Sequence, residues 1–115
     1  MPIEQRSNRV RVEVDGVTVA DSDTPTFLFE AGLPVRYYLP QSDVRMDLLT
    51  PTDLSTTCHW KGQARYWSVT VNGRTHDNIV WGYEHPLSEA QEIAGLVSFY
   101  NEKVDIFVDE VPATS

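Results

Sequence analysis

The sequence predicts one mostly β domain over residues 9–110, with flexible tails at 1–8 and 111–115. Two Gly-containing turns, each flanked by alternating apolar residues, are the main evidence, because such turns are typical of two-residue β-hairpins. Three Trp, five Tyr and four Phe support the same conclusion, since aromatic side chains favour pleated, half-buried surfaces. Only one short helix is predicted, near the C-terminal end, so we expect the α+β character to be minor.

The first hairpin is predicted around Asp15-Gly16. An Asp-Gly pair favours a type I′ turn, which needs positive φ at both central residues. A two-residue loop pairs Val14 with Val17 and Val12 with Val19. The valines on both sides of the turn therefore share one face, which we expect to be buried.

The next stretch, from residue 26 to residue 57, predicts short elements. Thr26–Glu30 and Val35–Leu39 are interpreted as strands, because Gly and Pro residues bound them. Ser42 is a candidate cap for a short helical turn that runs to Met46. Pro51–Thr57 is interpreted as a loop or an irregular strand.

The second hairpin joins Gln63–Val71 to Arg74–Tyr83 through Asn72-Gly73. The register of a two-residue turn places Tyr66 opposite Ile79 and Ala64 opposite Trp81 on one face. On the other face it places Trp67 opposite Asn78 and Val69 opposite His76. Because both faces carry large apolar groups, this hairpin must be covered on both sides or must line a cavity.

A helix and a final strand are predicted near the C-terminal end. The Ser88-x-x-Gln91 spacing is typical of a capping box, and a helical stripe follows it. We expect about ten helical residues with Ala90, Ile93, Ala94 and Val97 inward. Lys103–Val108 is expected to close the fold as a strand with Val104, Ile106 and Val108 inward.

The charge distribution bears on the partners. The net charge is −8, which opposes non-specific binding to nucleic acid, because such binding depends on Lys and Arg neutralising phosphates. Residues 36–83 nevertheless carry five Lys or Arg against four Asp, so this segment would not repel a polar or anionic ligand.

No amphipathic or apolar stretch predicts membrane binding. A single cysteine and the lack of a signal-peptide pattern favour the cytoplasm. The oligomeric state is left open, a homodimer included.

Cys58 and Lys61 are the candidate catalytic residues. A thiol near Lys61 and flanked by His59 could have a lowered pKa and act as a nucleophile. However, sequence neighbours on an extended chain point to opposite sides, so His59 is poorly placed as a base, and a cysteine is more often a small buried hydrophobe. Cys58 and the three histidines lack metal-ligand spacing, so we expect no metal and no cofactor.

Aromatic and cationic residues of the middle segment are candidates for ligand binding. Aromatic rings beside donors can hold a flat polar ligand, and Arg can bind a phosphate or carboxylate in bidentate fashion. Core packing of the tryptophans and surface ion pairs of the arginines are the competing interpretations. The candidates are Arg36, Tyr37, Arg45, Trp60, Lys61, Trp67 and Trp81.

Several segments in fixed order resemble the bacterial and fungal family called domain of unknown function 427 (DUF427). They are Leu33–Pro40, Asp43–Leu49, Thr57–Trp67, Trp81–Pro86 and Val97–Tyr100. The resemblance covers residues 9 to 110 and implies a β-tent fold, in which two antiparallel sheets meet at an angle. Methionine sulfoxide reductases that carry zinc and the ligand-binding domain of cereblon have this architecture.

The resemblance has one clear departure. The family pattern Cys-Pro-Tyr-Lys-Gly is similar to Cys58-His59-Trp60-Lys61-Gly62, so Cys58 and Lys61 match whereas a tyrosine hydroxyl at position 60 is missing. The zinc-binding C-x-x-C pairs of other β-tent proteins are absent, so the resemblance implies no metal here.

Three functional hypotheses follow. The first is a small-molecule-binding domain, with the aromatic candidates and Lys61 facing one cleft between the sheets and Arg36 or Arg45 at its mouth. The second is an enzyme with a redox or nucleophilic centre at Cys58. The third is a protein-interaction domain that uses an aromatic patch.

Overall fold

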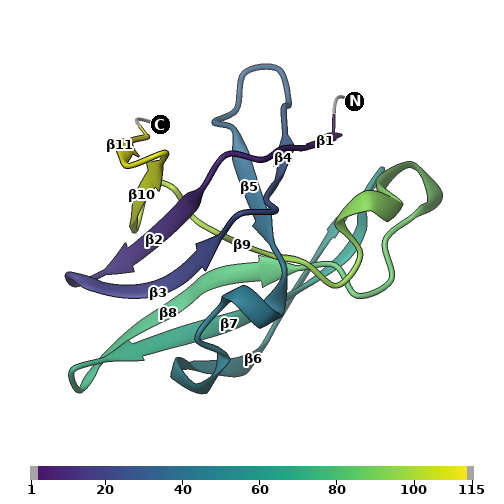
Figure 1. Ribbon diagram of the computed structural model, residues 1–115. Coiled ribbons are helices and arrows are strands. Elements are labelled where there is room, and N and C mark those ends of the chain that lie inside the picture. The colour runs from purple at the N-terminus through teal and green to yellow at the C-terminus, as the bar shows by residue number, and fades with distance from the viewer. Residues whose placement is uncertain (1–2, 114–115) are drawn as a thin grey trace.

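The computed structural model describes residues 3–113, which form two antiparallel sheets and confirm the predicted mostly β fold (Figure 1). The larger sheet has seven strands in the order β1-β4-β5-β9-β8-β7-β6, and the smaller has four in the order β11-β10-β2-β3. The seven strands are β1 (Ile3–Gln5), β4 (Thr26–Leu28), β5 (Arg36–Leu39), β6 (Leu49–Cys58), β7 (Gly62–Val71), β8 (Arg74–Gly82) and β9 (Val97–Phe99). The four strands are β2 (Val10–Val14), β3 (Val17–Ser22), β10 (Asp105–Val108) and β11 (Val111–Pro112).

The β2–β3 hairpin confirms the predicted turn, with φ of 50° at Asp15 and 79° at Gly16. Val14 pairs with Val17 as expected, but the predicted pairing of Val12 with Val19 is wrong. The register shifts next to Val12, which pairs with Ala20 instead. The bulge adds one residue to β3 without exposing Val19, which remains fully buried.

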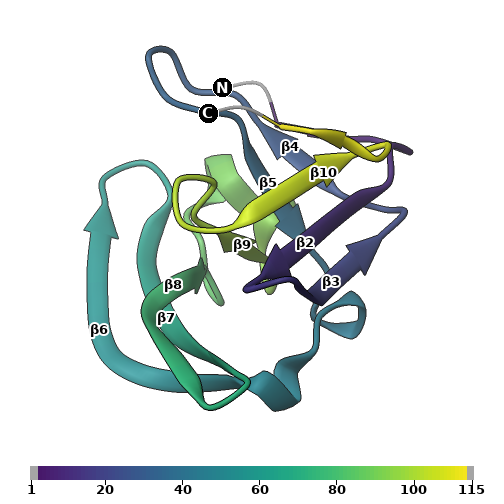
Figure 2. The same cartoon turned by 90° about the vertical axis from the view of Figure 1, so that its left-hand side faces the viewer.

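The main core lies between the two sheets. Its members include the valines of β2 and β3, Ile106 of β10, and Trp67, Val69 and Val71 of β7. Strands β2, β3 and β10 lie across β5 and β9 in the second view (Figure 2). The alternating pattern of β2 puts Val10, Val12 and Val14 in this core because successive side chains of a strand point to opposite faces.

The β7–β8 hairpin also has its predicted turn, with φ of 51° at Asn72 and 77° at Gly73. The pairing of Val69 with His76 is confirmed, but beyond it the register shifts. Trp67 then pairs with Val80 and Tyr66 with Trp81, not with Asn78 and Ile79 as predicted. Asn78 at φ 53° forms the irregularity, where its N–H donates to Ser68 Oγ at 3.0 Å. The shift of two residues leaves Trp67 and Tyr66 on their predicted opposite faces.

Of the two alternatives predicted for Pro51–Thr57, the irregular strand is confirmed and the loop is wrong: the segment lies within strand β6. It pairs with β7 along its length, with an irregularity between Pro51 and Ser55. The predicted helical turn at Ser42 is two short 3₁₀ turns, η1 (Gln41–Asp43) and η2 (Met46–Leu48). Neither turn has a side-chain cap, so Ser42 does not act as predicted.

The predicted ten-residue helix is wrong in type and length. Ser88–Ile93 forms a 3₁₀ segment, η3, without the predicted cap, and Gln91 Nε2 donates to the carbonyl oxygen of Pro86 at 2.6 Å instead. Ala90 and Ile93 are fully buried as expected. Val97 belongs to β9, where it pairs with Leu39 and Gly82, so sheet pairing determines its conformation.

Parts of both expected tails pair in sheets. Ile3–Gln5 pairs with β4, and Val111–Pro112 pairs with β10. The final strand is confirmed as β10, with Ile106 buried and Val104 and Val108 half-buried. Between residues 3 and 113, no helix has the length and apolar character needed to cross a membrane.

Candidate functional site

The face of the seven-stranded sheet opposite the main core carries a second, largely buried cluster of aromatic side chains together with paired charges. We call it the tyrosine-rich face. Register sets its composition: Tyr66 pairs with Trp81, Trp81 with Ser98, and Ser98 with Tyr38, so these four side chains form one row. A second apolar cluster, which includes Tyr83 and the two buried residues of η3, packs around this row.

A largely buried ion pair lies at one end of the tyrosine-rich face. Lys61 Nζ is 3.0 Å from Glu30 Oε1, and the two side chains are only 11% and 14% exposed. Trp60 Nε1 donates to the other oxygen of Glu30 at 3.3 Å. Glu30 follows β4 and Lys61 precedes β7, which are separated in the sheet by three strands. The sheet is therefore curled enough to bring these two ends together.

Aromatic rings surround the ammonium group of Lys61. Its Nζ lies 5.3 Å from the centre of the Trp60 ring and 5.7 Å from the centre of the Tyr83 ring. Both distances are within the range of cation–π attraction. The rings and the carboxylate of Glu30 together compensate Lys61 for its loss of water.

Arg36 lies on the same face, at the start of β5. Its guanidinium is 5.2 Å from the Trp81 ring centre and 5.5 Å from the Tyr100 ring centre. Glu102 binds it at 2.7 Å. Arg36 thus contacts Trp81, another of the ligand-binding candidates, although its charge is already paired with Glu102.

Burial perturbs the phenols of this face. Burial raises the pKa of Tyr38 and of Tyr83 far above the usual value, and it raises the pKa of Tyr100 to about 12. Trp81 Nε1 donates to the Tyr38 hydroxyl at 3.0 Å, which partly opposes the effect on Tyr38. These phenols are therefore neutral donors at physiological pH.

The hydroxyl group of Ser98 differs from the other polar groups of this face in its hydrogen bonding. Among the buried side-chain atoms of residues 3–113, its Oγ is the one without a hydrogen-bond partner. It lies between Tyr38 and Trp81 in the row described above. An unpaired buried hydroxyl is unusual in native proteins, so packing alone does not account for this position.

Cys58 ends β6 opposite Gly62 and is half-buried. It alternates with Thr57 and so shares its side of the sheet with Thr56, whose hydroxyl is 2.9 Å from that of Tyr66. The thiol is one of the neighbouring groups that add to the effect of burial on the Tyr83 pKa. Cys58 therefore lies at the border of the tyrosine-rich face.

The structure separates the predicted ligand-binding residues into three places. Trp60, Lys61, Trp81 and Arg36 share the tyrosine-rich face. Trp67 and Tyr37 belong to the main core between the sheets, where Tyr37 packs edge-on against Phe27 at 4.8 Å. Arg45 is exposed and paired with Asp47 at 2.9 Å. The expectation that all three indoles face one cleft between the sheets is therefore wrong, because residues 67 and 81 point to opposite faces of the hairpin.

Sequence reasoning missed Glu30, Tyr66, Tyr83 and Tyr100 as members of this face. Alternation along the strands could have indicated two of these residues. It directs Tyr66 away from Trp67, and it places Tyr83, two residues after Trp81, on the same side as Trp81. Glu30 gave no signal, because its pairing with Lys61 depends on the curl of the whole sheet.

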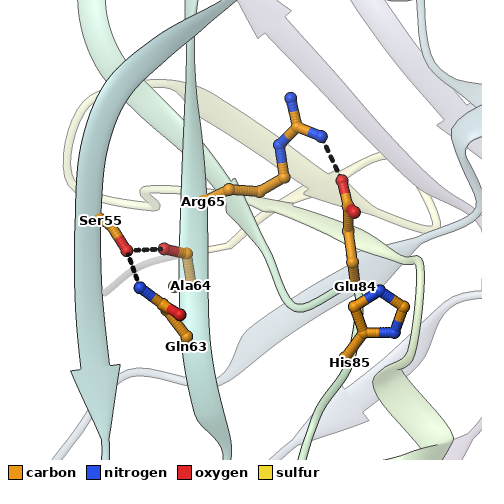
Figure 3. Close-up of a pocket in the computed structure, with 6 residues that line it drawn as sticks. All are labelled: Ser55, Gln63, Ala64, Arg65, Glu84 and His85. Atoms are coloured by element: carbon orange, nitrogen blue, oxygen red, sulfur yellow. Dashed lines mark hydrogen bonds and ion pairs between the residues drawn. The ribbon is translucent and has the colours of Figure 1, made fainter.

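The opposite side of β7 carries a small pocket of about 250 Å³. Figure 3 shows Arg65 reaching to Glu84, with His85 beside it and the Ser55–Gln63 pair across the gap. Ala64 also lines the pocket and accepts a hydrogen bond from Ser55 Oγ at 3.2 Å through its carbonyl oxygen. Within residues 3–113, this pocket included, no three His, Cys, Asp or Glu side chains are grouped closely enough to hold a metal ion.

The fold and this face together define a small two-sheet β protein with a second, largely buried aromatic cluster that holds paired charges. The chain belongs to the family described as domain of unknown function 427, whose model matches residues 2–110. A comparison with curated proteins gave no significant match.

Proposed function

We propose that the protein binds a small, flat, polar ligand at the tyrosine-rich face. The observation that carries this proposal is the Lys61–Glu30 pair, which is almost withdrawn from water and is surrounded by aromatic rings. Withdrawing two charges from water is unfavourable, and replacing such a pair by apolar residues is often neutral or stabilising. We infer that such a pair is kept here because it binds a polar ligand.

The residues around the pair suit a flat ligand. Trp60 and Tyr100 are only half-buried, so their rings remain accessible for stacking. Lys61 and the Trp60 indole supply donors, and Glu30 supplies an acceptor within hydrogen-bond distance of both. A polar ring edge could therefore exchange hydrogen bonds with this group while its face contacts the aromatic side chains.

The unpartnered hydroxyl of Ser98 supports the same location. It lies between Tyr38 and Trp81 on the face that carries Lys61. Small movements of the surrounding rings would let a ligand atom or a water molecule bind it. We also expect the protein to work in the reducing cytoplasm, where the thiol of Cys58 stays free.

A metabolite library screened by quenching of tryptophan fluorescence tests the proposal. We expect saturable quenching by at least one flat polar compound, retained in Trp67→Phe and lost in Trp60→Phe. Trp67 is the matched control because it lies in the main core. Lys103→Gln removes an exposed lysine that also lies near an aromatic ring, at 5.2 Å from Tyr100, and should leave binding unchanged.

Cys58→Ser separates ligand binding from the enzyme hypothesis. Simple binding predicts that this variant responds like the natural protein. Loss of the response, together with fast alkylation of the thiol at neutral pH, would favour a nucleophilic centre at Cys58 instead. Quenching that survives Trp60→Phe and disappears in Trp67→Phe would contradict the proposed site.

A further inference from the structure

We propose that the pocket between Arg65 and Gln63 is a second binding site, specific for a small oxyanion such as a phosphate or carboxylate group. It lies on the other side of β7 from the tyrosine-rich face, because Arg65 and Ser55 alternate with Ala64 and Thr56. The inference therefore does not depend on the function proposed above.

The guanidinium of Arg65 is held in place by two neighbours, and two of its nitrogen atoms can still donate hydrogen bonds to a ligand. The guanidinium stacks 4.6 Å from the centre of the Trp67 ring, and its Nη1 pairs with Glu84. Within residues 3–113, no hydrogen bond or ion pair engages its Nε or Nη2. These two N–H groups lie side by side on the planar guanidinium, an arrangement that matches the two oxygens of a carboxylate or phosphate.

The opposite wall also presents donors. Gln63 Nε2 donates to Ser55 Oγ at 2.8 Å, which fixes the orientation of the amide and leaves its second N–H free. His85 adds an imidazole, which carries a donor N–H whatever its charge. An oxyanion in the gap shown in Figure 3 would thus meet donors from both sides.

Glu84 is the one acidic residue among those that line the pocket, and its charge should lower the affinity for an oxyanion. The Arg65 guanidinium holds the pKa of Glu84 below its usual range, so this carboxylate stays ionised and competes with a ligand for Arg65. The volume of about 250 Å³ accommodates a small group such as phosphate or acetate. We therefore expect weak, saturable and salt-dependent binding.

Titration of the ¹⁵N-labelled full chain with inorganic phosphate, followed by amide NMR at low ionic strength, tests the inference; acetate is the second probe. We expect saturable shifts at residues 63–65 and 84–85. Arg65→Gln should weaken binding about tenfold or more, since hydrogen bonds to charged groups are the strong ones. Arg74→Gln is the matched control, because Arg74 is 73% exposed and lies outside the pocket.

Glu84→Gln provides the decisive variant. Removing the competing charge should tighten phosphate binding about threefold or more, since it abolishes a short-range repulsion and leaves Arg65 Nη1 with only a neutral, weaker acceptor. Weaker binding in Glu84→Gln would overturn the inference, and so would equal losses in Arg65→Gln and Arg74→Gln. If Arg65→Gln disturbs the whole amide spectrum, Arg65→Lys keeps the charge without the paired donors and should bind with intermediate affinity. Comparison of the dissociation constants for phosphate and for acetate identifies which oxyanion the site prefers.

Discussion

Lys61 is a lysine whose ammonium group has exchanged most of its water for one carboxylate and two aromatic rings. Such a group is stable only while its partner is present, because an unpaired buried charge is strongly unfavourable. The same carboxylate also binds the Trp60 indole, so Glu30 connects two residues of one turn to a distant strand. Residues 30, 60 and 61 therefore act as a unit.

Removing only one charge of the Lys61–Glu30 pair should destabilise the protein more than replacing both residues by apolar ones. Lys61→Met leaves Glu30 without its cation and should lower the free energy of unfolding by about 3 kcal/mol. The double variant Lys61→Met/Glu30→Leu removes both charges and should recover most of that loss. Urea unfolding followed by fluorescence measures both quantities.

Arg45→Gln serves as the control for this comparison. The Arg45–Asp47 pair has a similar separation, 2.9 Å, but its side chains are 57% and 63% exposed. Its loss should change stability by about 0.5 kcal/mol or less. A double variant that is less stable than Lys61→Met alone would refute the buried-pair argument.

At the scale of an element, the β7–β8 hairpin shows how a local irregularity positions a site. Its turn would pair Ala64 with Trp81, but the bulge at Asn78 brings Trp81 opposite Tyr66 and so into the row with Ser98 and Tyr38. Asn78 adopts a left-handed φ of 53°, and Thr52 Oγ1 donates to its side-chain oxygen at 2.5 Å. Asparagine suits this conformation better than most residues.

Substitutions at Asn78 should separate backbone strain from hydrogen bonding. Asn78→Val forces a β-branched residue into the left-handed region and should cost about 1–2 kcal/mol from strain alone. Asn78→Gly tolerates the backbone and loses only the bond from Thr52, so it should be less destabilising. Thermal unfolding compares the two, with Thr52→Val as the variant that loses the bond without strain. Equal losses in the valine and glycine variants would count against the strained bulge.

At the scale of the whole molecule, the seven-stranded sheet has two different faces. One face packs on the four-stranded sheet through a mainly apolar core and also carries Arg65 and its pocket, whereas the other combines phenols, two indoles and paired charges. The phenols come from β5 and β7 and from the residues directly after β8 and β9, so their environment reports on the packing of several strands of the sheet. Their protonation consequently couples to global unfolding.

This coupling predicts the alkaline limit of the protein. Tyr38, Tyr83 and Tyr100 have pKa values raised above the unfolded value of about 10, so the folded state holds more protons in this range. The stability that they contribute is fully present below about pH 10 and declines as the pH rises toward 12. Urea unfolding at a series of pH values should show this decline, and Tyr83→Phe should make it shallower. Native phenols that all titrate with the ordinary midpoint near pH 10 would contradict the prediction.

Local sequence determined the two hairpin turns, most of the strands and the faces of the two hairpins. Asp15-Gly16 and Asn72-Gly73 predict their hairpins because the need for positive φ is met by the residues themselves. Alternation even assigned Trp67 and Trp81 to opposite faces, which already conflicted with a cleft shared by all three indoles. The family resemblance correctly indicated DUF427 and two antiparallel sheets.

Tertiary structure decided the rest, because the interactions concerned join residues that are distant in the chain. The bulges beside Val12 and at Asn78 and the recruitment of Val97 to β9 follow from pairing with other strands, and Ser88–Ile93 forms a 3₁₀ segment instead of an α-helix. The Glu30–Lys61 pair spans 31 residues and exists only because the sheet curls. No local pattern encodes that curvature, since it sums the twist of all seven strands.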